Sequence, residues 1–153
     1  MGVAGCGKTT VGRALADALG LTFHDADDFH PEANVAKMRS GTPLTDADRW
    51  PWLETLSGLL REPVVLACSA LKESYRTRLS LGGSPVFVYL RITPETATAR
   101  LQARADHFMP SSLIKSQFET LEEPDSAIVL DAELSLADEI EVCLEALRRQ
   151  GLR

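Results

Sequence analysis

Apolar residues along the chain form two kinds of pattern that alternate: helical spacing and short continuous runs. Between residues 9 and 19 they recur at helical spacing, with Gly20 where a left-handed cap is needed, whereas residues 63–70 form the continuous apolar run typical of a strand buried on both faces. The helical period predicts helices at residues 9–19, 31–41, 50–61, 69–80, 93–104, 111–121 and about 135–149. The apolar runs predict strands at residues 21–25, 63–70, 85–92 and 126–131.

The alternation of strands and helices predicts the fold class. Strands that take turns with helices form a parallel sheet with helices on both faces, an α/β fold. The chain has 153 residues and contains no repeat, low-complexity segment or linker, so we expect a single domain over residues 1–153. The alternative that some of the short apolar runs are helical stays open, because periodicity alone does not separate the two.

Polar residues and prolines mark several helix starts. Thr93 followed by Pro94 is the combination expected of an N-cap and a first helical position. Ser135 with Asp138 predicts a capping box for the last helix. Pro51 is expected in the first turn of the helix at residues 50–61, where its missing N–H is tolerated.

The chain opens with a glycine-rich segment, MGVAGCGKTT. The spacing G-x-x-x-x-G-K-[ST], expected by chance only ~0.002 times in this composition, is matched by Gly2, Gly7, Lys8 and Thr9. Glycines let successive backbone N–H groups point at phosphate oxygens, the lysine reaches the outer phosphates, and the threonine hydroxyl binds Mg²⁺. The following helix adds its positive N-terminal end. The predicted nucleotide-binding loop consists of Gly2, Val3, Ala4, Gly5, Cys6, Gly7, Lys8, Thr9 and Thr10.

The position of this loop in the chain raises a second expectation. A phosphate loop is normally held by a buried strand that precedes it, and only Met1 stands before this one. We therefore expect the first strand of the fold to be truncated, with Met1 an internal methionine at the end of that strand and the natural start upstream. A chain that lacks a core strand is expected to be poorly stable or inactive.

Two aspartates follow the first helix in the segment HDADDFHP. Asp25 ends a predicted strand and Asp27 lies two residues on, so in an extended chain both side chains point toward the phosphate loop. Asp25 is predicted to join Thr9 in the magnesium shell, and Asp27 to take a hydroxyl proton or to orient the acceptor. The alternative for such a pair is a solvated acidic turn.

Charge and composition narrow the function classes. The net charge of -6 argues against a nucleic-acid or membrane-surface binder, because phosphate affinity needs a basic face. Cys6, Cys68 and Cys143 show no CxxC pair and no metal spacing, so we expect a reduced, cytoplasmic protein without a zinc site. Whether Cys6 is a reactive thiol or only a small residue stays open. The guanine motif NKxD is absent, which disfavours a GTPase.

Four longer segments carry a family resemblance. They read GVAGCGKTT, DADDFHPEANVAKMRSGTPLTDADRWPWL, CSALKESYR and HFMPSSLIKSQFETLEEP. With them the chain resembles, over nearly its whole length, the gluconokinases of the shikimate-kinase-like group of small P-loop kinases. The resemblance implies transfer of the γ-phosphate of ATP, with Mg²⁺, to the 6-hydroxyl of D-gluconate, and suggests a homodimer. Two alternatives stay open: a kinase for shikimate or another small hydroxy acid, and a non-catalytic ATP-binding regulatory protein.

Further candidate residues lie within these segments. Arg100 and Arg104, four residues apart on one helix, resemble the lid arginines of small kinases, in a lid at about residues 100–118 that also contains His107. The candidates for the gluconate pocket are Asp27, His30, Lys37, Arg49, Ser69, Lys72 and Gln117. Arg49 and Lys72 are the preferred partners of the gluconate carboxylate. For the candidates other than Ser69, a surface charge or salt bridge is the alternative. For Arg100 and Arg104 the alternative is a solvated helix face. Trp50 and Trp52 are expected in the core.

Overall fold

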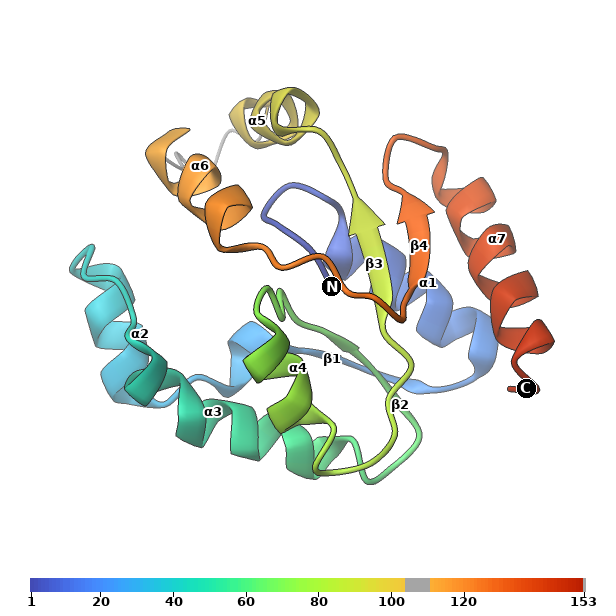
Figure 1. Cartoon of the computed structure of the whole chain (residues 1–153), viewed down its shortest axis with the longest axis horizontal. Coiled ribbons are helices and arrows are strands. Elements are labelled where there is room, and N and C mark those ends of the chain that lie inside the picture. Colours follow the sequence, from blue (N-terminus) through green and yellow to red (C-terminus); the bar gives the residue numbers. More distant parts are fainter. Residues whose placement is uncertain (104–110, 153) are drawn as a thin grey trace.

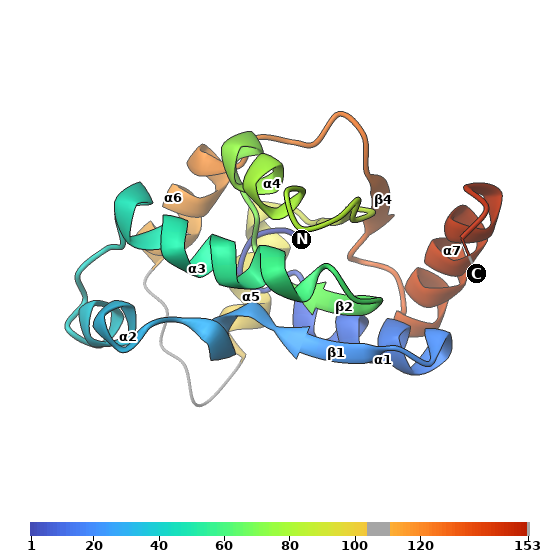
Figure 2. The same cartoon turned by 90° about the horizontal axis from the view of Figure 1, so that it is seen from below.

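The computed structural model describes residues 1–103 and 111–152 and confirms the α/β fold (Figure 1). The elements are α1 (Lys8–Leu19), β1 (Thr22–Asp25), the 3-10 helix η1 (Ala26–Phe29), α2 (Glu32–Arg39), α3 (Asp46–Leu59), β2 (Val64–Ala67), α4 (Glu73–Leu79), β3 (Val88–Arg91), α5 (Pro94–Gln102), α6 (Ser111–Thr120), β4 (Ile128–Asp131) and α7 (Leu136–Arg149). Each predicted strand and helix is present. Figures 1 and 2 both place α2 and α7 at opposite ends of the molecule.

The four strands pair in parallel, as predicted, but as two separate pairs. β1 pairs with β2, from Thr22 opposite Val64 to Asp25 opposite Ala67. β3 pairs with β4, from Val88 opposite Ile128 to Arg91 opposite Asp131. The single sheet expected from the sequence is therefore divided into two two-stranded sheets in the described part of the chain.

The first two residues bridge these pairs. The Met1 ammonium donates to the Val88 carbonyl at 2.6 Å, and the Met1 carbonyl accepts from the Leu90 amide at 3.0 Å. On the other side, the Gly2 amide donates to the Ser69 carbonyl at 3.1 Å. Within the described residues, no strand element precedes the phosphate loop, and Met1 and Gly2 supply these backbone bonds.

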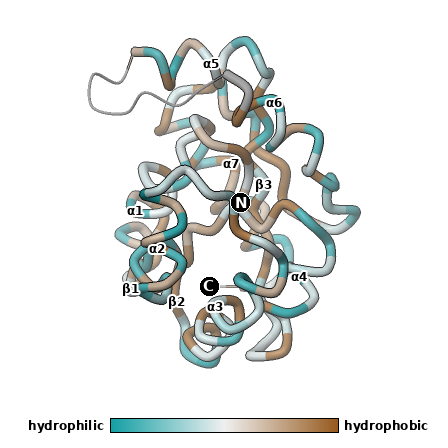
Figure 3. The backbone as a smooth tube through the Cα atoms, turned by 90° about the vertical axis from the view of Figure 1, so that its left-hand side faces the viewer, coloured by the Kyte–Doolittle hydropathy of each residue, from teal (hydrophilic) through white to brown (hydrophobic). Residues whose placement is uncertain are grey.

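A cavity of about 500 Å³ lies between the two pairs. Its walls come from β2, from the segment that leads into β3 and from the inner face of α1, and they are mostly apolar. Figure 3 shows hydrophobic segments of the chain, in brown, close to the N-terminus and along β3. The cavity is a gap between the strand pairs, and Met1 and Lys8, on either side of the phosphate loop, contribute to its walls.

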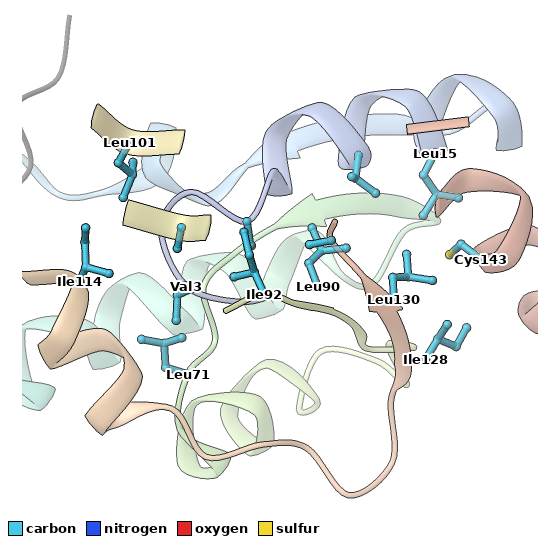
Figure 4. Close-up of a cluster of buried hydrophobic side chains, with 14 of the residues drawn as sticks. Val3, Leu15, Leu71, Leu90, Ile92, Leu101, Ile114, Ile128, Leu130 and Cys143 are labelled. Carbon is cyan, nitrogen blue, oxygen red and sulfur yellow. The ribbon is translucent and has the colours of Figure 1, made fainter. Parts of the chain in front are cut away.

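The buried side chains form two clusters, and residues of both clusters line the cavity. The β3–β4 core gathers side chains from α1, β3, β4, α5, α6 and α7, with Val3, Leu90 and Leu130 nearly inaccessible (Figure 4). The α3–α4 core is built around Leu53 and Leu56, which are fully buried. Neighbouring residues of β2 belong to different clusters, Val65 to the first and Leu66 to the second, so the two cores do not follow the division of the sheet.

Two helices begin at positions that differ from the prediction. α3 starts at Asp46, before residue 50, because Thr45 and Asp48 form a capping box: the Asp48 amide donates to Thr45 Oγ1 at 3.2 Å and the Thr45 amide to Asp48 Oδ2 at 2.9 Å. Pro51 consequently lies inside α3 and not in its first turn. α4 starts at Glu73 because residues 69–72 are not helical, with φ of 45° at Ala70.

Other local predictions are confirmed. Thr93 and Ser135 are N-caps whose side chains accept from the amides of Thr96 and Asp138, and Gly20 is a left-handed C-cap with φ of 66°. At Ser135 only this half of the predicted capping box forms, because Asp138 Oδ2 accepts from the Ser135 hydroxyl at 2.6 Å. Trp52 is buried and donates its indole N–H to the Ala26 carbonyl at 2.9 Å, whereas Trp50 is only half-buried. Among the described helices, none combines the length and the apolar character that a membrane span requires.

Candidate active site

The phosphate loop, residues 2–7, leads directly into α1. Gly7 is the N-cap of α1 with φ of 97°, and its helix start receives no side-chain cap. At Gly5, with φ of 83°, a Cβ atom would lie 2.9 Å from the Ala97 carbonyl oxygen. Both glycines are thus required by the backbone. Because the first amides of α1 have no side-chain acceptor, they remain available to an anion.

Two side chains hold the loop in shape. Lys8 Nζ donates to the Val3 carbonyl at 3.0 Å, so the lysine lies across the loop that it follows. From α6, Gln117 Oε1 accepts from the Ala4 amide at 2.6 Å. Gln117, which was predicted to bind the acceptor, contacts the phosphate loop in this structure. It ties α6 to the loop.

Thr9 and Asp25 come together as predicted. The Thr9 hydroxyl donates to Asp25 Oδ2 at 2.8 Å, and Asp25 Oδ1 accepts from the Asp27 amide at 3.2 Å. A hydroxyl and a carboxylate are the hard oxygen donors that Mg²⁺ prefers, and Mg²⁺ usually takes only one or two carboxylates beside phosphates and water. The residues therefore fit a magnesium site, although residues 1–103 and 111–152 contain no cluster of three His, Cys, Asp or Glu ligands.

Asp27 and His30 lie beside this pair in and just after η1. The pKa of Asp27 is raised, first by desolvation and then by the Asp25 carboxylate; because 88% of its side chain is exposed, the carboxylate is the physically significant cause. His30 Nε2 lies 4.0 Å from Asp27 Oδ1, and its ring stacks on Trp52 with centroids 4.2 Å apart. Burial lowers the pKa of His30, which favours the neutral ring.

A cluster of charged groups joins α3 to α4. We call it the Asp46 cluster, and it consists of Asp46, Arg49, Lys72 and Tyr75. Asp46 accepts from the Tyr75 hydroxyl at 2.5 Å, from Lys72 Nζ at 3.0 Å and from an Arg49 N–H at 3.4 Å. These bonds, the Tyr75 bond first, lower the pKa of Asp46. The structure thus brings together Arg49 and Lys72, the two residues predicted to bind the gluconate carboxylate. They meet around Asp46 and Tyr75, which the sequence did not indicate.

Lys37 does not join this cluster. Its Nζ donates to both carboxylate oxygens of Asp48, at 2.7 and 2.9 Å, and so connects α2 to the first turn of α3. The bond from Lys37, followed by the Thr45 amide, lowers the pKa of Asp48 to about 2. Lys37 is therefore engaged in an ion pair that supports the capping box of α3.

Ser69 lies in the segment that connects β2 to α4, two residues after the end of β2. Its carbonyl accepts from the Gly2 amide, so this segment contacts the start of the phosphate loop. The positive φ of Ala70 is stabilised by Arg76, a side chain that is only 3% exposed and donates to the carbonyls of Ala70 at 3.0 Å and Leu71 at 3.2 Å. Because Asp25 is opposite Ala67 in the β1–β2 register, Ser69 follows at the same edge of the sheet as Asp25, where α/β folds bind ligands.

The predicted lid is described only in part. Arg100, on α5, donates to the Ala132 carbonyl at 2.6 Å, just after the end of β4. Arg104 and His107 lie outside the described residues. Of the buried thiols, Cys68 and Cys143 have pKa values raised by burial to about 11, which favours the neutral thiol at both positions.

Comparisons with known proteins agree with this geometry. The family model for shikimate kinase matches residues 4–138. A gluconokinase from Gluconobacter oxydans is 51% identical over 81% of this chain and 74% of its own length. The thermosensitive gluconokinase of Escherichia coli is 42% identical over 96% of this chain and 84% of its own. A crystal structure of a gluconokinase from Sinorhizobium meliloti superposes with a TM-score of 0.89 and 42% identity, covering 98% of this chain and 90% of that one.

A phosphate loop on a parallel α/β scaffold, together with the shikimate kinase match, defines an enzyme of the P-loop kinase class that uses a nucleotide. The relatives narrow that class. The chain belongs to the gluconokinase family, a branch of the shikimate-kinase-like kinases.

Proposed function

We propose that the protein transfers the γ-phosphate of ATP to the 6-hydroxyl of D-gluconate, giving 6-phospho-D-gluconate. One observation in this chain supports that acceptor more than any other. Arg49 and Lys72 lie close enough together to share one carboxylate, and both are about one-third exposed, so an acid in solution can reach them. Gluconate carries one carboxylate and a row of hydroxyls, which matches a paired cation beside hydrogen-bonding groups.

The phosphate-loop side binds and orients the nucleotide. The loop amides and Lys8 hold the outer phosphates, and Thr9 with Asp25 supplies the protein oxygens for Mg²⁺. When bound, Mg²⁺ neutralises charge on the phosphates of ATP. Arg100, with Arg104 in the lid at about residues 100–118, completes the proposed nucleotide contacts. Phosphoryl transfer depends mostly on positioning and charge neutralisation, so these groups carry most of the rate.

The acceptor side positions the attacking hydroxyl. Asp27 Oδ1 lies 4.0 Å from His30 Nε2. A carboxylate oxygen of Asp27 accepts or orients the proton of the 6-hydroxyl. Arg49 and Lys72 hold the acid end of the sugar, and Ser69 lines the intervening edge of the sheet. Because Lys37 and Gln117 are bonded to Asp48 and to the Ala4 amide, we assign them a supporting role and no direct contact with gluconate.

The experiment is ADP release with magnesium-ATP, measured with D-gluconate, with shikimate and without acceptor. Release that depends on D-gluconate and is absent with shikimate is expected. ADP release that depends on shikimate would show that D-gluconate is the wrong acceptor. Nucleotide binding without acceptor-dependent ADP release would contradict the kinase function. Light scattering on the same sample tests the homodimer that the resemblance suggests.

A further inference from the structure

The Asp46 cluster contains two residues, Asp46 and Tyr75, for which the reaction itself provides no role. We propose that Asp46, fixed by Tyr75, is a positioning residue that holds Arg49 and Lys72 side by side for the carboxylate of the acceptor. The inference rests on the proposed function, since it assigns a role within the same acceptor site.

Three donors converge on the single carboxylate of Asp46. Asp46 Oδ2 accepts from Lys72 Nζ at 3.0 Å, and Asp46 Oδ1 accepts from the Tyr75 hydroxyl and from Arg49. The donors come from two helices, since Arg49 is one turn along α3 and Lys72 is the N-cap of α4. Two cations placed together repel each other, so an anion between them is needed to keep them adjacent.

Burial decreases across the cluster from Tyr75 to the charged side chains. The Tyr75 residue is 5% exposed, whereas the side chains of Lys72, Arg49 and Asp46 are 33%, 30% and 43% exposed. The buried Tyr75 side chain is therefore held in place by packing, whereas the side chains of Lys72 and Arg49 are accessible to the acceptor. Both cations also lie over the Tyr75 ring, with Arg49 Cζ at 5.6 Å and Lys72 Nζ at 5.4 Å from its centroid. The ring and Asp46 together restrict the directions that the two cations can take.

The cluster has spare hydrogen-bond donors and a net positive charge. An ammonium has three N–H donors and a guanidinium has five, so each cation has more donors than its bond to Asp46 uses. Two positive charges and one negative charge leave the cluster with one net positive charge, which matches a single carboxylate. Asp46 can therefore stay in place while the acceptor binds.

The test separates positioning from a general loss of structure. Asp46→Asn is expected to raise the KM for D-gluconate about tenfold, the size expected for weakening hydrogen bonds to charged groups. kcat and the KM for ATP should stay within about twofold of the wild-type values, because the phosphate loop is not involved. Tyr75→Phe, which removes only the hydroxyl, should raise the KM for D-gluconate about threefold, and it covers the case in which Asp46→Asn does not fold.

Matched controls are available in the same chain. Glu54→Gln removes a carboxylate from α3 that pairs with Arg78 at 3.5 Å, and Tyr89→Phe removes a phenol that donates to Glu123 at 3.3 Å. Both should leave the KM for D-gluconate unchanged. If these controls raise the KM as much as Asp46→Asn and Tyr75→Phe do, the effect is general and the inference is wrong.

A double-mutant cycle with Lys72→Met completes the test. Lys72→Met alone should raise the KM for D-gluconate, and Asp46→Asn should then add much less than its effect in the wild-type background. If Lys72→Met leaves the KM unchanged, the assignment of Lys72 to the carboxylate in the proposed function fails. If Lys72→Met raises the KM but Asp46→Asn does not, or adds its full effect in both backgrounds, the proposed function stands and the positioning role is overturned.

Discussion

In the phosphate loop, backbone amides at the start of α1 form the site, with glycines at the positions where φ is positive. In the Asp46 cluster, side chains of α3 and of the start of α4 form the site, and they are bonded to one another. A backbone site is formed mainly by the local fold of the chain, although Gln117 of α6 also bonds a loop amide. A side-chain site depends on the packing of one helix on another, so it can be disturbed from a distance.

The two sites are also expected to fail in different ways. The loop contacts the phosphates that change during the reaction, so its loss should lower kcat. The Asp46 cluster lies where the acid end of the acceptor is proposed to bind, and that end does not react. Damage there should raise the KM for D-gluconate and leave kcat nearly unchanged.

The largest expected effect is that of Lys8→Ala. Because this lysine supplies positive charge to the outer phosphates, its removal should lower kcat by at least about 10²-fold. Steady-state ADP release measures this effect, and Arg149→Ala, which removes an exposed cation paired with Glu145, is the control. Turnover that survives in Lys8→Ala would contradict the role of the lysine and the contrast between the two sites.

Asp27→Asn should come next, with a loss of about 10²-fold in kcat while ATP still binds. The pKa of Asp27 is raised, and the group acts when ionised, so wild-type activity should fall as the pH drops through this raised pKa. The variant should lack this acidic limb of the pH profile. Asp28→Asn, at the next position of η1, is the control. If the acidic limb of the pH profile is unchanged in Asp27→Asn, a group other than Asp27 is responsible for that limb.

The same contrast explains what the sequence could predict. Spacing alone placed Lys8 and Thr9 in the loop and paired Thr9 with Asp25, because glycine requirements and strand ends are local properties. Asp46 and Tyr75 are 29 positions apart, and their bond depends on the packing of α3 against α4, so no local pattern indicates it.

Motif membership was also a weak guide to individual roles. It selected Lys37 and Gln117 for the acceptor site, yet Lys37 bonds Asp48 and Gln117 bonds the Ala4 amide. The early start of α3 was a different kind of miss. Thr45 and Asp48 have the spacing of a capping box, so that signal was present in the sequence and was overlooked.

The cavity between the two strand pairs gives a third prediction, on stability. A chain extended ahead of Met1 by Val-Ile-Val-Val can run between β2 and β3, pair with both and fill part of the cavity of about 500 Å³. Each apolar side chain that becomes buried should contribute about 1.5 kcal/mol or more. We expect a higher Tm by roughly 5 °C or more, measured by calorimetry. An extension of Gly-Ser-Gly-Ser, which cannot fill the cavity, should not raise Tm.

The pH dependence of stability provides a second test of the extended chains. Burial lowers the pKa of the Met1 ammonium from 8.0 to about 6, so between these values the unfolded chain binds more protons than the folded one. The stability of the unextended chain should therefore rise with pH in this window. Both extended chains should lose this contribution, since their Met1 nitrogen is an amide. Equal Tm values for the apolar and polar extensions would contradict the strand-like filling of the gap.

The smallest expected effect compares helix caps on the two sides of the molecule. Thr45 caps α3, which carries Asp46 and Arg49, whereas Thr93 caps α5 in the β3–β4 core. Thr45→Ala and Thr93→Ala should each destabilise the protein by about 1 kcal/mol, because each removes one N-cap hydrogen bond. Only Thr45→Ala should also raise the KM for D-gluconate, by about two- to threefold, since Asp46 is the first residue of the helix that loses its cap. If both variants change the KM equally, the acceptor site responds to overall stability and not to the cap of α3. The proposed contrast between the phosphate loop, built from the backbone, and the Asp46 cluster, built by helix packing, would then be wrong.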